Sequence, residues 1–220
     1  MAERFDIYDE QGQWIGTATR AETHAKGLWH RSFHCWLARR GEDGRARILF
    51  QRRTATKDTN PGCYDITVAG HLSAGETVRD AAREMEEEIG FAVPFERLIP
   101  LGTFREEDSG VAGGVPYIDR EESVVFGCLT VRALNAFQLQ PEEVAGLYEA
   151  DAEALLALVR GEVASVLARG VGLTKDGRLA PVEAEVSADA FVPRDPAYYI
   201  RCFEALNAMA TSDLEAFDET

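Results

Sequence analysis

Residues 70–91 read GHLSAGETVRDAAREMEEEIGF, and this stretch decides how the rest of the chain is interpreted. Four apolar residues recur at offsets of four, three and four, the spacing of a helix with one face toward a core: Val78, Ala82, Met85 and Ile89. Thr77 and Asp80 predict an N-cap with a capping-box partner, and Gly90 predicts the C-terminal end. The sequence therefore predicts a single helix of about 13 residues.

The opposite face of this predicted helix is crowded with carboxylates. Glu84, Glu87 and Glu88 stand at i, i+3 and i+4, so their side chains converge on one patch. Like charges at this spacing destabilise a helix by a few tenths of a kcal/mol each. A divalent cation relieves the repulsion, because Mg2+ prefers carboxylate oxygens and commonly bridges to substrate phosphates. The pattern indicates either a metal site or an ordinary solvated acidic face.

The same stretch resembles the Nudix box, whose core is R-E-U-x-E-E-x-G-U with U apolar. Residues 83–91, REMEEEIGF, match that core, and Gly70 followed by Glu76 matches the G-x5-E opening. Only six residues separate Glu76 from Arg83, where the family has seven. We expect the loop at residues 72–75 to absorb the difference, because a deletion inside the helix would rotate the box by about 100° against its cap.

The resemblance implies a Nudix hydrolase, an enzyme that cleaves a diphosphate linkage by attack of water on phosphorus. It implies an α/β protein, with a Nudix-type α/β/α sandwich and a mixed sheet over residues 1–160. We expect a mainly helical C-terminal extension over residues 161–220, packed on that core. The resemblance makes Glu84, Glu87 and Glu88 metal ligands for Mg2+, or Mn2+. Arg83 would orient the catalytic helix through an ion pair with Glu76, which makes Glu76, Arg83, Glu84 and Glu87 the expected catalytic residues.

Basic residues just before the box are candidates for holding the substrate. Arg52, Arg53 and Lys57 precede the last strand expected before the box, and each could give a phosphate oxygen a charge-assisted hydrogen bond. His71, inside the box opening, is the fourth candidate substrate-binding residue. The expected partner is therefore a small-molecule diphosphate.

Other titratable residues are open to two interpretations. Glu122 and Glu143 are candidates for the general base by position, although each also fits an ordinary surface acid. His24, His30 and His34 suggest a zinc site. Their spacing is loose, and histidines in a half-buried strand usually have hydrogen-bond partners, so zinc is the less favoured interpretation.

Two alternatives to hydrolysis remain. The pattern FDIYDEQGQWIG at residues 5–16 resembles the Nudix branch closest to isopentenyl-diphosphate isomerases. That chemistry is expected to use a cysteine two residues before the histidine of the box, and here Ala69 precedes His71, which disfavours an isomerase. A non-catalytic Nudix-fold binding module would be expected to lose the box glutamates, which this chain keeps.

Composition limits the cell-biological possibilities. A net charge of −15 over 220 residues argues against non-specific binding to nucleic acid or anionic membranes, which requires basic surface. An apolar fraction of 45% suits a packed core, and the four cysteines lack paired metal-type spacing, as expected for free thiols in a reducing compartment. We expect a cytoplasmic protein, either monomeric or homodimeric.

The remaining elements follow from periodicity and turn residues. Strands are predicted over residues 5–8, 14–18, 30–38, 47–53, 64–68, 97–104, 122–131 and 143–149, with a connector at 24–30. Helices are predicted over 151–159, 163–167 and 195–209, and a hairpin around residues 176–177. Residues 105–120 contain three glycines and a proline and are predicted to form a flexible binding loop. Residues 213–220 are predicted to fray.

Overall fold

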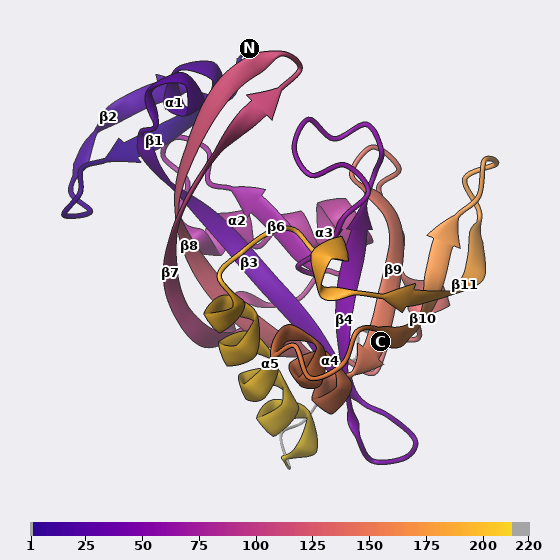
Figure 1. The fold of residues 1–220 in the computed structure, drawn as a ribbon. Coiled ribbons are helices and arrows are strands. Elements are labelled where there is room, and N and C mark those ends of the chain that lie inside the picture. The colour runs from indigo at the N-terminus through magenta and orange to yellow at the C-terminus, as the bar shows by residue number, and fades with distance from the viewer. Residues whose placement is uncertain (1, 213–220) are drawn as a thin grey trace.

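The computed structural model describes residues 2–212, which build a mixed sheet between helices (Figure 1). The strands are β1 (Arg4–Tyr8), β2 (Trp14–Thr19), β3 (Trp29–Arg40), β4 (Ala46–Arg53), β5 (Tyr64–Asp65), β6 (Val68–His71), β7 (Ile99–Ala112), β8 (Val115–Leu129), β9 (Val144–Asp151), β10 (Val166–Leu173) and β11 (Leu179–Val186). The main path runs β11-β10-β9-β4-β3-β1-β2, with β5 on β4, β6 and β8 on β3, and β7 on β8. Only β3 and β8 pair in parallel among the described strands, so the sheet is mixed, as predicted.

Helices cover both faces of the sheet. They are α1 (Arg20–Lys26), α2 (Val78–Ala81), α3 (Glu84–Ile89), α4 (Ala152–Val159) and α5 (Pro196–Thr211). Along β3, Phe33 and Leu37 belong to the core under α2 and α3, whereas Trp36 belongs to the core under α4 and α5. Successive strand residues point to opposite faces, so a strand buried on both sides is apolar almost throughout. The predicted α/β/α arrangement is confirmed.

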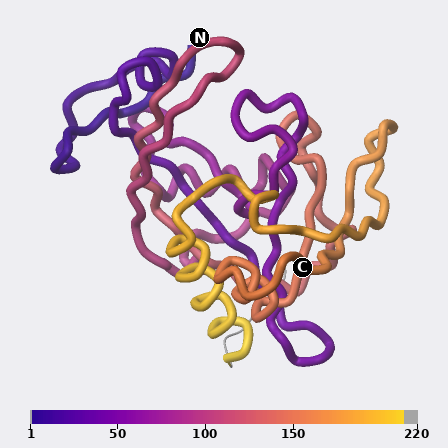
Figure 2. Tube along the Cα trace, viewed as in Figure 1, coloured from indigo at the N-terminus to yellow at the C-terminus, as the bar shows by residue number. Residues whose placement is uncertain are grey.

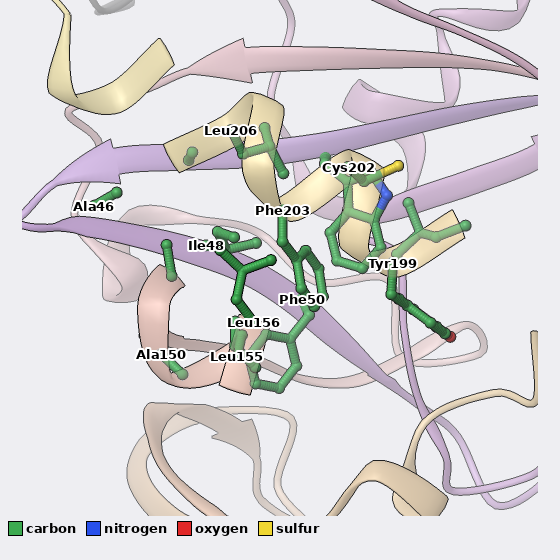
Figure 3. Close-up of a cluster of buried hydrophobic side chains, with 14 of the residues drawn as sticks. Ala46, Ile48, Phe50, Ala150, Leu155, Leu156, Tyr199, Cys202, Phe203 and Leu206 are labelled. Atoms are coloured by element: carbon green, nitrogen blue, oxygen red, sulfur yellow. The ribbon is translucent and has the colours of Figure 1, made fainter. Parts of the chain in front are cut away.

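The core on the second face joins the C-terminal segment to the rest of the molecule. Figure 3 shows Phe203 from α5 and Leu155 from α4 gathered over Ile48 and Phe50 of β4. Asp195 caps α5 by accepting a hydrogen bond from the Ala197 amide. The helix predicted over residues 195–209 is thereby confirmed, with its apolar side on the sheet.

The box helix differs from the prediction. The capping box of Thr77 with Asp80 is present and Gly90 ends the segment in the left-handed conformation, but α2 stops at Ala81 and α3 starts at Glu84. Hydrogen bonds of the i→i−3 type recur through the break: Asp80 to Thr77, Ala82 to Arg79, Arg83 to Asp80, Met85 to Ala82 and Glu86 to Arg83.

The chain around this break is wound more tightly than an α-helix. An α-helix turns about 100° per residue and a 3-10 helix about 120°, and the i→i−3 bonds here are mixed with i→i−4 bonds from Ala81 to Thr77 and from Glu87 to Arg83. The single helix that the sequence predicts is therefore interrupted at residues 82–83, whereas the expectation that the loop at residues 72–75 absorbs the missing residue stays a prediction.

The segment predicted as a flexible loop is also different. Residues 105–120 belong to a long antiparallel hairpin, in which Asp108 faces Asp119 across β7 and β8. Its outer part stands beside the β1–β2 hairpin and α1 rather than over the core (Figure 2), so neither face of these strands needs apolar residues. The glycines Gly113 and Gly114 form only the turn, with positive φ angles of 56° and 83°.

Two further elements depart from the sequence prediction. Helix α1 was not predicted: a capping box between Thr19 and Glu22 starts it and Gly27 ends it, so its last three residues fall within the connector expected at residues 24–30. The short helix predicted over 163–167 is wrong, because residues from Val166 onward form β10, which pairs with β9. The hairpin around residues 176–177 is confirmed, so the C-terminal segment is part sheet and part helix. Residues 213–220, predicted to fray, lie outside the described part.

No helix among the described residues has the length and apolar character needed to cross a membrane.

Candidate functional site

A cleft of about 820 Å³ opens beside the box. Its walls come from β3, β6, β7, β8, α3, the loop after β4 and the segment before α5. Twelve of its lining residues are acidic and five are basic, the latter being Arg20, Arg53, Lys57, Arg105 and Arg194. Among the described residues, the apolar side chains that line the cleft are only Ala69, Val192 and Pro193. The cleft is therefore a polar site with an excess of negative charge.

All three box glutamates that the sequence marks as metal ligands line this cleft. Glu88 is only 5% exposed, and its carboxylate accepts a hydrogen bond of 3.1 Å from the Gln51 amide. Burial, and then the charge of Glu84, raise the pKa of Glu88 to about 8. Burial also raises the pKa of Glu84. Glu87 is more open, with 52% of its side chain exposed.

Gly70 makes room for one of these carboxylates. A Cβ atom at this position would lie 2.6 Å from Cδ of Glu84, closer than side-chain contacts allow. The glycine that opens the box is therefore required because Glu84 passes directly over the backbone of β6.

Arg83 is the counter-ion of the acidic patch. Its Nε donates to Glu76 at 3.0 Å, while its Nη1 lies 2.8 Å from Glu84 and 2.5 Å from Glu87. Burial opposes ionisation of Glu76, but hydrogen bonds from Arg83 and from the Ser73 amide lower the pKa of Glu76 below its ordinary value. Glu76 and Arg83 are therefore in contact even though the box is one residue short between them.

The charge and burial of the box fit a divalent cation. Glu84 and Glu88 hold buried negative charge that raises both pKa values, and a cation offsets such charge directly. The carboxylate oxygens of Glu84, Glu87 and Glu88 do not all lie within 4.8 Å of one another. Among the described residues, the sets of three potential ligand atoms that meet this distance are formed by other side chains. Arg83 instead bridges Glu84 and Glu87.

The tight ligand groups belong to a second set of residues, which we call the histidine–carboxylate cluster: His24, His30, His71, Asp119 and Glu121. Nε2 of His71 lies 2.8 Å from Glu121, and Nε2 of His30 lies 3.5 Å from Asp119 and 3.7 Å from Glu121. Strand register brings these together, because His30 faces Glu121 across the parallel pair of β3 and β8. Phe5 stacks on the rings of His30 and His71.

The electrostatics of the cluster suit metal coordination. Burial is the main reason that the pKa values of His24 and His30 fall to about 4, so both imidazoles are neutral, the form that binds metals. Burial, and then Glu121, raise the pKa of Asp119 to about 7. The Nε2 atoms of His24 and His30 and Oδ1 of Asp119 are buried without a hydrogen bond, and the two nitrogens lie 3.7 Å and 3.5 Å from that oxygen. Imidazole and carboxylate donors together favour a transition metal such as Mn2+ or Zn2+.

The three histidines that were weighed, and not favoured, as a zinc site are only partly brought together. His24 and His30 belong to the cluster with His71, which the sequence had suggested as a substrate ligand. His34 lies apart and makes hydrogen bonds with Tyr198 and Ser32. Asp119 was missed because it falls in the segment predicted as a loop; the run of acids at residues 119, 121 and 122 next to an apolar strand was the available signal.

The candidate phosphate ligands divide into two groups. Arg53 and Lys57 line the cleft, where Arg53 pairs with Asp65 at 3.0 Å and Lys57 pairs with Glu143. Arg52 is not among the lining residues, and its guanidinium donates to the Gly62 carbonyl at 3.2 Å.

The two candidate general bases differ in their position relative to the cleft. Glu143 lines the cleft, whereas Glu122 lies outside it and pairs with Arg31 and Arg105, each at 2.9 Å. Arg194, which sequence reasoning did not single out, lines the cleft from the segment before α5 and pairs with Asp65 at 2.7 Å.

Comparison with known proteins identifies the family of this chain. A model of the NUDIX domain matches residues 28–169. An uncharacterized Nudix hydrolase of Clostridium acetobutylicum is 34% identical over 207 residues, covering 94% of this chain and 98% of that protein. Another, from Yersinia pestis, is 36% identical over 147 residues, covering 66% of this chain and 70% of that protein. A solved structure from Deinococcus radiodurans shares the fold with a TM-score of 0.53 and 22% identity, covering 72% of this chain and 90% of that one. The chain belongs to the Nudix hydrolase family.

Proposed function

We propose that this Nudix-type hydrolase cleaves the diphosphate linkage of a small polar molecule and depends on Mg2+, or Mn2+, to do so. Nudix hydrolases act in general on compounds linked to a nucleoside diphosphate and use divalent metal ions. The charge of the cleft carries the proposal for this chain. Twelve carboxylates face five basic side chains, so an anionic substrate meets net repulsion unless cations accompany it.

The residues of the box have distinct roles in this proposal. Glu84, Glu87 and Glu88 hold the cations, and Arg83 with Glu76 fixes the start of α3 so that these side chains face the cleft. When bound, the cations acidify the attacking water and stabilise the leaving phosphate. Arg83 must release Glu84 and Glu87 before these two carboxylates can bind a cation. After this release, the ion pair with Glu76 would keep the Arg83 side chain near the site.

The opposite wall would hold the substrate. Arg53 and Lys57 reach the cleft from β4 and the loop after it, and both are paired with acids that a phosphate could replace. His71 faces the same space, whereas Arg52 is directed toward Gly62 and has no such role. The scarcity of apolar lining favours a polar leaving group over a prenyl chain, and Ala69 at the cleft offers no thiol for isomerase chemistry.

A matched pair of variants tests this function. Glu87→Gln should keep the fold and abolish release of phosphate from a panel of nucleotide-linked and other diphosphates, with Mg2+ or Mn2+ present. Glu86→Gln changes a neighbouring exposed residue outside the cleft and should keep full activity. Equal activity of the two variants, or wild-type hydrolysis that persists in EDTA, would contradict the proposal.

We also propose that the histidine–carboxylate cluster is a second cation site. Its support is a set of three potential metal ligands that are buried without a hydrogen bond, Nε2 of His24, Nε2 of His30 and Oδ1 of Asp119, since buried polar atoms normally have hydrogen-bond partners. Co2+, whose visible spectrum reports its ligands, should bind the wild-type protein at this site with imidazole coordination. His30→Ala should lose this spectrum and Glu86→Gln should retain it; an identical spectrum in both variants would exclude the cluster.

A further inference from the structure

A row of polar side chains runs along one face of β3 beneath helix α5. His30, Ser32, His34 and Trp36 are alternate residues of this strand, so they point to the same side of the sheet. All four are buried, with His34 and Ser32 each 2% exposed. His30 belongs to the histidine–carboxylate cluster, and Trp36 belongs to the core that α5 completes. The row therefore connects the C-terminal helix with the cluster.

Hydrogen bonds join the members of this row into a continuous chain. Trp36 Nε1 donates to the Tyr198 hydroxyl at 3.2 Å, and that hydroxyl lies 3.0 Å from Nδ1 of His34. Nε2 of His34 lies 3.4 Å from the Ser32 hydroxyl, which donates to Oε2 of Glu121 at 3.1 Å. The other oxygen of Glu121, Oε1, is the atom 2.8 Å from His71.

The chemistry of the two end groups indicates the direction of the bonds between them. An indole N–H can only donate and an ionised carboxylate can only accept. Because Tyr198 accepts from Trp36, its own proton is available for Nδ1 of His34. A neutral imidazole that accepts at Nδ1 carries its proton on Nε2 and donates it to Ser32. Ser32 then donates its proton onward, to Oε2 of Glu121 at 3.1 Å or to the Ser123 hydroxyl at 2.9 Å, and the charged carboxylate is the stronger acceptor of the two.

We propose that Tyr198 is a positioning residue, which holds the carboxylate of Glu121 through His34 and Ser32 in the orientation that the histidine–carboxylate cluster needs to bind a cation. One oxygen of Glu121 is occupied by Ser32, which leaves the other directed at His71 and His30. Hydrogen-bonded neighbours of metal ligands commonly fix ligand orientation in this way. The inference rests on the cluster as a cation site and is independent of the chemistry at the box.

The origin of Tyr198 gives the C-terminal segment a role beyond packing. The NUDIX model ends at residue 169, so α5 lies outside the matched region. The hydroxyl of Tyr198 is nevertheless the group that sets the tautomer of His34, in the middle of the matched sheet. A helix outside the region that the NUDIX model matches thereby takes part in the arrangement of the cluster.

The test compares removal of two buried hydroxyl groups on the same helix. Tyr198→Phe breaks the chain at its origin, whereas Tyr199→Phe removes a hydroxyl that donates to the Val192 carbonyl and is not part of the chain. Ser32→Ala breaks the last link directly. Long-range 1H–15N NMR of the histidine side chains and titration of the metal-free protein with Co2+ alone are the two measurements.

The proposal predicts that His34 is protonated at Nε2 in the wild type and in Tyr199→Phe, and that this pattern changes in Tyr198→Phe. Co2+ should bind about 10- to 100-fold more weakly to Tyr198→Phe and to Ser32→Ala, with an altered spectrum. Equal Co2+ affinity in Tyr198→Phe and Tyr199→Phe would overturn the positioning role, as would a wild-type His34 protonated at Nδ1. Absence of Co2+ binding in the wild type would overturn the inference while leaving hydrolysis at the box untouched.

Discussion

Glu88→Gln should stabilise the metal-free protein at neutral pH, although it removes an expected metal ligand. The pKa of this buried carboxyl is raised from 4.5 to about 8, first by burial and then by Glu84. Below pH 4.5 the carboxyl is protonated in both the folded and the unfolded chain, and folding is unaffected. As the pH rises toward 8, the unfolded chain ionises first, so the free energy of unfolding falls. Glutamine has the same shape and no charge, and it can still accept from Gln51.

The size of the effect follows from the shift in pKa. One unit corresponds to about 1.4 kcal/mol, so the full penalty above pH 8 is about 5 kcal/mol as an upper value. At pH 7 the penalty is about 3 kcal/mol, and at pH 5 it is under about 1 kcal/mol. For a chain of this length, 3 kcal/mol corresponds to an increase in Tm of roughly 6–12 °C.

Urea denaturation in EDTA at pH 5, 7 and 8 measures this difference. Glu86→Gln, at an exposed position on the same helix, is the control and should leave the free energy of unfolding unchanged. Added Mg2+ should stabilise the wild type by mass action and leave Glu88→Gln nearly unaffected, because the substitution removes a ligand. A wild-type protein whose stability is flat between pH 5 and 8, with Glu88→Gln no more stable, would refute the electrostatic reasoning.

Three further substitutions test other parts of the structure. Gly70→Ala should displace Glu84, lower hydrolysis at least about tenfold and destabilise the fold by about 1–3 kcal/mol, as measured by kcat and Tm. Phe203→Ala should lower the free energy of unfolding in urea by about 3–5 kcal/mol, because the ring is fully buried; a loss below about 1 kcal/mol would show that α5 is dispensable. Arg194→Leu should cost about 3–5 kcal/mol by leaving Asp65 with one fewer partner, and adding Asp65→Asn should restore part of it.

Local sequence signals were sufficient to predict where the box helix begins and ends and which of its glutamates share one face. The capping box of Thr77 and Asp80, the stop at Gly90 and the spacing of the glutamates are all set within a few residues of one another. The break around residues 82–83 could not be predicted in the same way. It depends on how the helix must meet both its cap and the sheet, which is a tertiary constraint that periodicity does not contain.

The β7–β8 hairpin shows a different limit. Strands are recognised by alternation between an apolar and a polar face, and the outer part of this hairpin has no apolar face to show. Its glycines and charges therefore resemble a loop. This error also affected the prediction of the site, because Asp119 and Glu121 lie on β8, part of which was predicted as a loop.

The histidine–carboxylate cluster is a product of strand register. Parallel pairing of β3 with β8 places His30 opposite Glu121, and antiparallel pairing of β3 with β6 places Ser32 opposite His71. Because side chains alternate between faces, a slip of one residue between β3 and β8 would turn Glu121 away from all three histidines. The residues of the cluster span positions 24–121, so no local pattern contains it. What specifies the cluster is the apolar core that fixes the register of β3, and the same strand therefore determines both the fold and the site.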